Sequence, residues 1–426
     1  MKALEAEDSH RNSYKHVKPV SKKYNSQFLF IWFGQTASIF GDRVTGLALP
    51  WLLLQQTHSP FDTGIITALR YLPLIAFGLI AGLVVDRLNR RLVLITCDVV
   101  RAGILSLVVL VGVFQLTPPL WLLAGVVLVL GTGQLFFQTA YGAWLPDIIR
   151  EENLSSANAA LEASDAASTL AGPLLGGIII QAFGAVLSLG TDAISYIISA
   201  LMLLCVRNTE PSARRKMKMS EQKTTLSQLW SEALDGVRFI LSTPAQRLLK
   251  GVGTVLYLSS GSIELLLATL TQVRLHLPAW QAGFVFGAAG VGGLIGSALA
   301  PSFYRRGWRS SITAALLLGA LAAVGLACAG LLPASGGFVL ASVSNLLLDG
   351  AVSFSFILTT TESVLITPRQ IRGRVNAASN MYASLVRGVS VLLVGIIAAS
   401  GETAFAFACI ACFFIGGALL SRVSPA

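Results

Sequence analysis

The chain has 426 residues, of which 54% are hydrophobic and 12% are charged, and its mean hydropathy is +0.71. A soluble domain carries about 25% charged residues, and a soluble fold of this size has too little interior to hide so much apolar surface. The net charge of +10 does not indicate nucleic-acid binding, because the basic residues stand in short clusters between long apolar runs.

Twelve apolar runs predict transmembrane helices, each of which needs about 20 mostly apolar residues. Their continuous apolar character favours helices over the alternating strands of a membrane barrel. The expected spans are 27–56, 63–85, 92–114, 119–143, 156–181, 186–205, 245–272, 279–302, 310–331, 336–361, 373–399 and 403–421. The sequence therefore predicts an all-α integral membrane protein with twelve transmembrane helices. We expect it to be a multi-pass protein of the cell (inner) membrane.

Two polar segments interrupt the apolar pattern. Residues 1–26 are polar and charged, without the short apolar stretch of a signal peptide, and are expected to form a cytoplasmic tail. Residues 206–244 separate the sixth and seventh spans, and apolar residues from Leu226 to Leu241 recur there at helical spacing. This pattern predicts an amphipathic helix on the membrane surface within a cytoplasmic linker. We expect six-helix bundles at 27–205 and 245–426.

Charge distribution and internal similarity indicate the topology. Arginine and lysine gather in the tail, in the even-numbered loops and at the C-terminus, whereas the odd-numbered loops hold only Arg274. Both termini are therefore expected on the cytoplasmic side. The segment Gly78–Gly82 is echoed by Gly292–Gly296, and Asn158 with its two following alanines is echoed at Asn376, at nearly the same offset. This similarity favours two parallel repeats of six helices.

The segment Gly82–Arg91, between the second and third spans, reads GLVVDRLNRR and resembles the signature loop of the major facilitator superfamily. Asn89 stands where that family usually has glycine, and asparagine tolerates a left-handed turn. The resemblance implies that Asp86 locks the second helix to the eleventh while the cytoplasmic side is closed. A plain topology anchor is the alternative. The gating residues expected in this loop are Gly82, Asp86, Arg87, Arg90 and Arg91.

A second stretch, GPLLGG in the fifth span, resembles the motif of the antiporters in that superfamily and argues against an importer. Its gating residues are expected to pack at a moving interface, with static packing as the alternative. These residues are Gly172, Pro173, Gly176 and Gly177. The segments Gly41–Trp51 and Ile371–Val375 resemble the drug:proton antiporter branch that holds macrolide efflux pumps and the enterobactin exporter. The sequence departs from this family pattern in two places. The fourth helix has no arginine in Leu128–Gln134, and the copy of the signature loop in the second half has Ala300 at the aspartate position.

Polar residues recur at helical spacing in the first, fourth, seventh and tenth spans, which line the central cavity in the superfamily. The eleventh span adds further polar residues, whereas Arg70 in the second is placed near enough to the surface to snorkel. The residues expected in a substrate cavity are Gln35, Ser38, Arg43, Gln134, Gln138, Tyr141, Tyr257, Asn345, Asn380 and Arg387. Acidic residues in the cavity would suit a cation, whereas Arg43 and Arg387 would suit an anion such as a siderophore.

Proton coupling requires a titratable group within the spans, and all four histidines lie outside them. A buried carboxylate is therefore expected to carry the proton, with Asp42 as first choice, then Glu264 and Asp349. The alternative for Asp42 is a permanent ion pair with Arg43, although neighbouring residues on a helix point about 100° apart. Asp98 and Arg101, three residues apart on the third span, are expected to form a structural salt bridge, and Asp165 to lie near the cytoplasmic mouth.

Other functional classes fit less well. The chain has no G-x-x-x-x-G-K-[ST] loop for an ATP-driven pump, and no histidine in a span for an intramembrane enzyme. The five cysteines lie in apolar runs without metal-ligand spacing, so no metal or cofactor is expected. We expect a monomeric secondary transporter that works with a small-molecule substrate, protons and membrane lipids, and exports small amphipathic molecules by proton antiport through alternating access. The alternative is a lysophospholipid transporter of the same fold.

Overall fold

The computed structural model describes residues 26–149, 151–206 and 226–422, and every regular element within these ranges is a helix. Residues 1–25 of the expected tail and 207–225 of the expected linker lie outside the described residues. Long apolar segments in a bilayer are expected to be helical, because a helix satisfies its own backbone hydrogen bonds where no water is present.

The first group of helices begins at Ser26. These helices are α2 (Ser26–Thr57), α3 (Pro60–Ala68), α4 (Leu72–Arg87), α5 (Arg90–Val113), α6 (Leu120–Ile148), α7 (Glu151–Phe183) and α8 (Ala185–Cys205), with the 3₁₀ turn η1 (Leu69–Tyr71) between α3 and α4. At the start of α5, the side chain of Asn89 accepts a hydrogen bond from the backbone N–H of Leu92 at 3.2 Å. The backbone of Asn89 is extended, with φ −71° and ψ 112°, so Asn89 caps α5 and the expected left-handed turn is wrong.

The second group of helices follows the linker. These helices are α10 (Leu226–Ser242), α11 (Pro244–Ala268), α12 (Ala279–Ala329), α13 (Ala334–Ile366), α14 (Arg372–Ala399) and α15 (Thr403–Arg422), with the π-helical turn η2 (Thr269–Arg274) after α11 and the 3₁₀ turn η3 (Arg369–Ile371) before α14. α12 breaks at Gly307, whose φ of 126° strains any residue with a Cβ. The break divides α12 into two candidate spans, Ala279–Tyr304 and Gly307–Ala329.

Ten helices in the described ranges are long and apolar enough to cross a membrane, and the number is eleven if the bent pair Pro60–Gly78 and Ile80–Arg87 forms one span. α2 is not among them, although its 32 residues exceed the roughly 20 that a bilayer requires. The polar residues along α2, such as Asp42 and Arg43, lower its hydropathy. Twelve crossings therefore remain a prediction that depends on α2.

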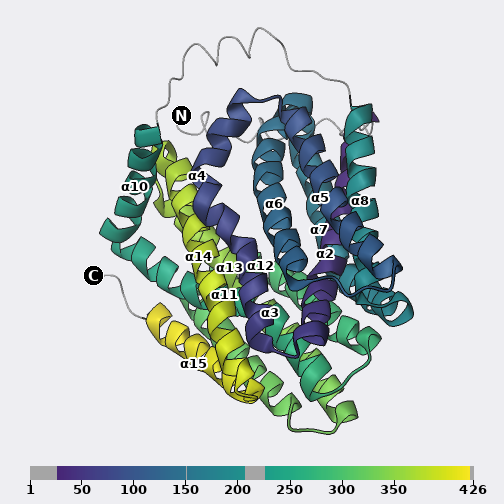
Figure 1. Cartoon of the computed structure of the whole chain (residues 1–426). Helices are drawn as coiled ribbons and strands as arrows, with labels where there is room; N and C mark the ends of the chain where they lie inside the picture. Colours follow the sequence, from purple (N-terminus) through teal and green to yellow (C-terminus); the bar gives the residue numbers. More distant parts are fainter. Residues whose placement is uncertain (1–25, 150, 207–225, 423–426) are drawn as a thin grey trace, which may run out of the picture.

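The helices give the molecule two distinct ends. One end, here called the arginine-rich end, holds the α4–α5 junction with Arg87, Arg90 and Arg91 and the beginning of α14, at the top of Figure 1. The opposite or far end holds the turns at His58 and His276. α7 begins and α13 ends several residues beyond the expected spans, and both extensions lie at the arginine-rich end. Backbone hydrogen bonds continue there after the apolar pattern has stopped.

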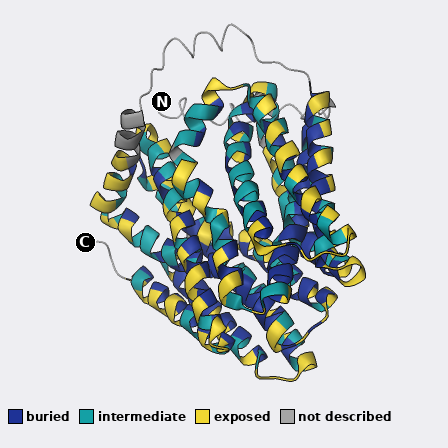
Figure 2. Cartoon of the chain, viewed as in Figure 1, coloured by how far each residue is buried: buried dark blue, intermediate teal, exposed yellow. Residues whose placement is uncertain are grey.

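Buried apolar residues form three clusters. One lies within residues 28–206, and another lies within residues 252–418. The third joins residues 47–196 to Ala279 and Ala282 at the start of α12, and thereby links the two groups of helices. Exposed large apolar side chains, such as Leu110 of α5 and Phe413 of α15, cover the outside, and Figure 2 shows this exposure along the perimeter. Such a surface fits lipid as the surrounding solvent.

The expected amphipathic helix of the linker corresponds to α10. α10 packs against the beginning of α14, where a Cβ added at Gly236 would lie 2.5 Å from the backbone oxygen of Arg374. Asp235 also pairs with the guanidinium of Arg374 at 3.1 Å. Leu234 and Leu241 are 60% and 63% exposed, so α10 has an uncovered apolar side. That this side lies on the membrane surface remains a prediction.

Candidate substrate cavity and coupling network

A cavity of about 800 Å³ lies between the two groups of helices, which is a volume typical of sites for drug-sized ligands. Its wall contains all three carboxylates expected to couple protons: Asp42 of α2, Glu264 of α11 and Asp349 of α13. It also contains eight of the ten expected cavity residues. These are Gln35, Ser38, Arg43, Gln134, Gln138, Tyr141, Asn345 and Arg387.

Tyr257 and Asn380 do not line this cavity, contrary to the sequence-based expectation. Both line a separate cavity of about 260 Å³ among α11, α13 and α14. Tyr257 stands one turn before Ser260 on α11, and the guanidinium of Arg387 lies 5.3 Å from the centre of its ring. The ring of Tyr257 thus lies between Arg387, which lines the large cavity, and the small cavity. Helical spacing alone did not show that the polar stripe of α11 divides between two cavities.

Asp42 does not form the alternative ion pair with Arg43. Its carboxylate accepts a hydrogen bond from the hydroxyl of Tyr196 on α8, a residue that is 1% exposed. Arg43 instead donates from Nη2 to Asp165 Oδ1 of α7 at 2.9 Å. The side chains of Arg43 and Asp165 are 39% and 45% exposed, so solvent reaches this part of the cavity. The two neighbours on α2 therefore bind different helices, as their roughly 100° separation suggests.

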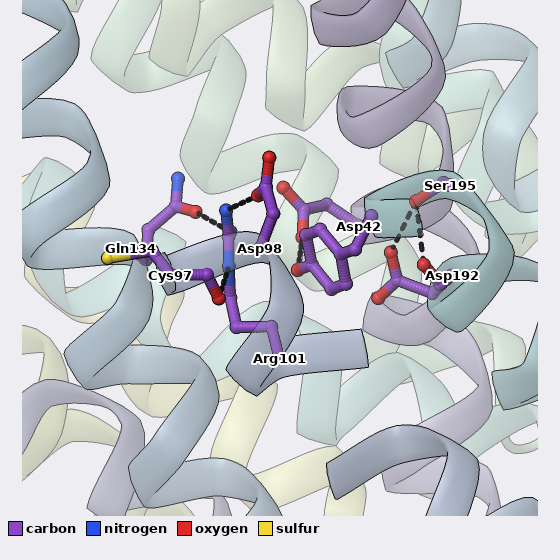
Figure 3. A network of polar contacts seen from close by, with 8 residues as sticks. Asp42, Cys97, Asp98, Arg101, Gln134, Asp192 and Ser195 are labelled. Atoms are coloured by element: carbon purple, nitrogen blue, oxygen red, sulfur yellow. Dashed lines mark hydrogen bonds and ion pairs between the residues drawn. The ribbon is translucent and has the colours of Figure 1, made fainter. Parts of the chain in front are cut away.

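Arg101 of α5 forms the centre of a buried network beside Asp42 (Figure 3). Its guanidinium donates to Asp98 Oδ1 at 2.5 Å and to Gln134 Oε1 of α6 at 3.1 Å. It also lies 4.1 Å from the centre of the Tyr196 ring. The expected Asp98–Arg101 pair is thus present, but Arg101 also lines the cavity. The sequence did not indicate this second role.

Gly133 of α6 allows Arg101 to reach this position. A Cβ added at Gly133 would lie 2.7 Å from Cδ of Arg101, closer than real Cβ contacts come. α6 itself has no arginine in Leu128–Gln134, and α5 supplies one against the same stretch. The neighbouring helix α5 therefore places a guanidinium in the cavity wall beside the stretch of α6 that has no arginine.

Asp192 of α8 is a buried carboxylate that the sequence analysis did not identify. It is 0% exposed and accepts hydrogen bonds from Thr45 at 2.6 Å and Ser195 at 3.0 Å. Gly41 packs directly against it, since an added Cβ would lie 2.4 Å from Asp192 Oδ1. Its position inside the expected span 186–205 was the available signal, because a carboxylate within a membrane span is costly and needs partners.

Arg70 lies in the cavity wall and does not snorkel to the outer surface. Its Nη1 is 3.9 Å from Glu264 Oε2. This ion pair joins the bend between α3 and α4 to α11 across the cavity. Their side chains are 46% and 41% exposed. This exposure weakens the pair, because water screens it. An ion pair of this kind can open when the two groups of helices move apart.

Small residues close the far end of the cavity. A Cβ added at Gly177 of α7 would lie 2.5 Å from the backbone oxygen of Ala279 and 2.9 Å from Cα of Gly283 in α12. Gly172 and Gly176, on another side of α7, face Arg43 and Val44 of α2. The expected gating motif therefore contacts both groups of helices, and α7 remains helical through Pro173.

Two hydrogen bonds at the far end also join the groups. Gln272 donates to the backbone oxygen of Trp51 at 3.3 Å, and the N–H of Ala279 donates to Gln181 Oε1 at 3.1 Å. The ion pairs inside the cavity nevertheless remain partly exposed to solvent. We infer that the cavity opens toward the arginine-rich end.

The family model described as "Major Facilitator Superfamily" matches residues 31–391, most of the chain. The chain belongs to the major facilitator superfamily. The structure of a nucleoside transporter superposes with a TM-score of 0.71 at 13% identity, over 93% of this chain and 98% of that one. A bacterial homologue of ferroportin in an inward-facing state superposes with a TM-score of 0.67 at 18% identity, over 94% and 98%. These likenesses show the shared fold. Membership of the superfamily, together with bacterial efflux relatives, makes this chain a multi-pass protein of the inner membrane.

Curated relatives of this superfamily member are efflux proteins. The multidrug efflux pump Tap of Mycolicibacterium fortuitum is 26% identical over 86% of this chain and 88% of the pump. The enterobactin exporter EntS of Escherichia coli O139:H28 is 25% identical over 89% of each chain. Macrolide efflux protein A of Streptococcus pyogenes is 24% identical, but the match spans only 44% of this chain and 46% of that protein.

The superfamily signature loop is held by Arg90. This side chain is 13% exposed and donates to Asp147 Oδ2 at 2.7 Å, to the backbone oxygen of Ala143 at 2.8 Å and to Asp86 Oδ1 at 3.3 Å. Arg91 donates to the backbone oxygens at the end of α8, whereas Arg87 is exposed. In this conformation Asp86 pairs with Arg90, and the expected lock onto the eleventh helix remains a prediction. A Cβ added at Gly82 would meet no other atom within 4 Å.

Arg90→Gln is expected to lower the free energy of unfolding by about 1–3 kcal/mol, because Asp147 and the Ala143 carbonyl lose a charged donor. Chemical unfolding of the purified protein in detergent micelles measures this change. Arg87→Gln is the matched control, and as an exposed substitution it should alter stability by less than about 0.5 kcal/mol. Equal stability of the two variants would contradict the role assigned to Arg90.

Proposed function

We propose that this protein is a secondary active transporter that exports small amphipathic molecules, drug-like or siderophore-like, by proton antiport through alternating access. The proposal includes twelve spans in two parallel six-helix repeats, with a linker at 206–244 and both termini in the cytoplasm. The arginine-rich end is then cytoplasmic, in agreement with the positive-inside rule. The present conformation accordingly faces inward.

The observation that carries this proposal is the solvent-accessible cavity between the two groups of helices, closed at the far end. A substrate taken from the cytoplasm would occupy it before the helices rock to the other side. Two of its wall groups, Gln35 Nε2 and the Tyr141 hydroxyl, are buried without a hydrogen-bond partner among the described residues. A polar group of the substrate would satisfy them once these side chains turn toward the cavity. The Tap pump and the enterobactin exporter support export as the direction.

Asp42 is our candidate for the proton carrier. It lines the cavity and accepts a hydrogen bond from Tyr196, whose ring lies 4.1 Å from the guanidinium carbon of Arg101. Protonation of Asp42 would weaken the charge interaction with Arg101 and change the contact between α2 and α8. Movement of one proton charge through 100 mV supplies about 2.3 kcal/mol, so one or two protons suffice for a substantial gradient of substrate. Glu264 and Asp349 are the second and third candidates.

The proposal is tested by compound accumulation in efflux-deficient bacteria that express wild type or Asp42→Asn. With macrolides, cationic dyes and siderophores as the panel, wild type should lower the accumulation of at least one compound. Asp42→Asn should abolish this effect, because the neutral amide cannot release a proton. Asp62→Asn, an exposed acid at the beginning of α3, should behave as wild type.

Equal protein levels and an uncoupler control complete this experiment. An uncoupler should raise accumulation in wild-type cells to the level of Asp42→Asn cells. If wild type lowers accumulation of no compound in the panel, export of drugs and siderophores is the wrong proposal. Lysophospholipid movement in vesicles would then be measured next. If Asp42→Asn exports as well as wild type, Asp42 is not the proton carrier.

A further inference from the structure

A second cavity, of about 260 Å³, lies at the arginine-rich end among α11, α13 and α14. It shares no lining residue with the large cavity. Its volume is below the roughly 300–1,000 Å³ of sites that hold drug-sized ligands. It is therefore suited to a compact chemical group and not to a whole drug molecule.

The lining of this cavity carries positive charge without a matching carboxylate. Lys250 of α11 and Arg372 at the beginning of α14 both line it, and no aspartate or glutamate does. In the described part of the chain, neither cation forms an ion pair. Arg372 donates from Nε to the backbone oxygen of Thr367 at 3.1 Å, which orients its guanidinium. Half-buried cations near a membrane interface require a counter-charge.

The neutral polar groups of the cavity also favour an anion. The hydroxyls of Thr359, Thr360 and Ser363 already donate to acceptors of the protein. The side-chain amides of Asn376 and Asn380, one turn apart on α14, are exposed and have no hydrogen-bond partner in the described ranges. Each amide offers two N–H donors. The two amides, the ammonium of Lys250 and the guanidinium of Arg372 therefore supply N–H donors to which a phosphate offers several acceptor oxygens.

The apolar wall of the cavity indicates where the rest of the ligand lies. Leu249, Val364 and the rings of Tyr257 and Phe356 line it together with the cations. The two rings pack edge to face, with their centres 6.2 Å apart. A charged group can therefore bind Lys250 and Arg372 while an attached chain contacts carbon atoms, which is the pattern of an amphiphile at a membrane interface.

We propose that this cavity binds the phosphate group of an anionic phospholipid, with Lys250 and Arg372 as its cations and the Asn376 and Asn380 amides as additional donors. The site is separate from the large cavity, and its occupation counters two half-buried positive charges beside the beginning of α14. α10 packs on the same segment, where Asp235 pairs with Arg374. Binding thereby stabilises the junction of the linker helix with α11 and α14.

The test is ligand binding to the purified full chain, measured by native mass spectrometry and by the shift in melting temperature. The probes are phosphatidylglycerol, phosphatidylcholine and inorganic phosphate. Phosphatidylglycerol should bind wild type and raise the melting temperature, whereas phosphatidylcholine should bind more weakly. Lys250→Gln and Arg372→Gln should each weaken phosphatidylglycerol binding about fivefold, the factor expected for loss of one basic residue near an anionic lipid. The conservative variant Lys250→Arg should retain binding.

Arg369→Gln is the matched control, because Arg369 is exposed, lies in the adjacent turn η3 and does not line the cavity. Its phosphatidylglycerol affinity should equal that of wild type. Wild-type affinity in both Lys250→Gln and Arg372→Gln would overturn the proposal, as would equal binding of the two lipids. If inorganic phosphate binds with the same dependence on Lys250 and Arg372, the phosphate group alone is recognised. These outcomes are independent of compound export, which tests the large cavity.

Discussion

Replacing Arg101 by glutamine is expected to lower the free energy of unfolding by about 3–5 kcal/mol, the cost of leaving one charge of a buried pair unmatched. Arg101 and Asp98 have side chains that are 1% and 0% exposed, so water cannot replace the lost partner. The change also removes the donor to Gln134 and the cation that faces the Tyr196 ring. Chemical unfolding in detergent micelles measures the loss.

A double substitution separates lost charge balance from lost packing. Asp98→Asn combined with Arg101→Gln removes both charges and should recover part of the stability, because no unpaired charge remains. Arg247→Gln, an exposed arginine on α11, should leave stability nearly unchanged. If the double variant is less stable than Arg101→Gln by itself, the pair is not held by charge compensation. Loss of packing around the network would then be the dominant effect.

Gly177→Ala is expected to shift the protein away from the conformation that is closed at the far end. The new Cβ would lie 2.5 Å from the backbone oxygen of Ala279, and backbone atoms cannot move aside as a flexible side chain can. Overpacking of this kind costs about 1–3 kcal/mol, which changes a two-state population by roughly 5-fold to 150-fold. Export should fall accordingly, because the protein would leave the conformation that is closed at the far end.

Distances between spin labels at positions 58 and 276, in a background with the cysteines replaced by serine, measure this shift. These positions lie in far-end turns of the two groups of helices, so their separation should increase in Gly177→Ala. Gly103→Ala is the matched control, since a Cβ there would meet no other atom within 4 Å. It should keep the wild-type distance distribution. An unchanged distribution in Gly177→Ala would show that contact between α7 and α12 does not control closure.

Membrane spans were predictable because the energetic cost of placing a side chain in lipid depends on that side chain and on its close neighbours. The break at Gly307 and the helix ends that extend beyond the apolar runs were harder to predict from the sequence, since backbone hydrogen bonding does not follow hydropathy. α2 shows the limit most clearly. Its polar residues lower its hydropathy, and the folded protein accommodates them because they face a cavity that other helices complete.

Spacing along the chain predicted the Asp98–Arg101 pair within α5, but it could not predict the ion pairs that join different helices. The sequence placed Arg43 beside Asp42, whereas the folded chain pairs Arg43 with Asp165, far away in sequence. Similarly, Arg70 meets Glu264 across the cavity. Each of these contacts depends on the distance between helices. Glycines set that distance where an added Cβ would collide with a neighbouring helix, and their role is visible only when both helices are in place.

The amino-acid sequence determined the membrane-spanning character, the family and the helices that carry polar residues into the interior, because composition and local motifs are sufficient for these. The tertiary structure decided which polar residues share a cavity. It excluded Tyr257 and Asn380 from the large cavity, placed Arg101 in its wall and revealed the buried Asp192. The physical reason is that a charge in a membrane protein is stabilised by partners on other helices, and helix packing selects those partners.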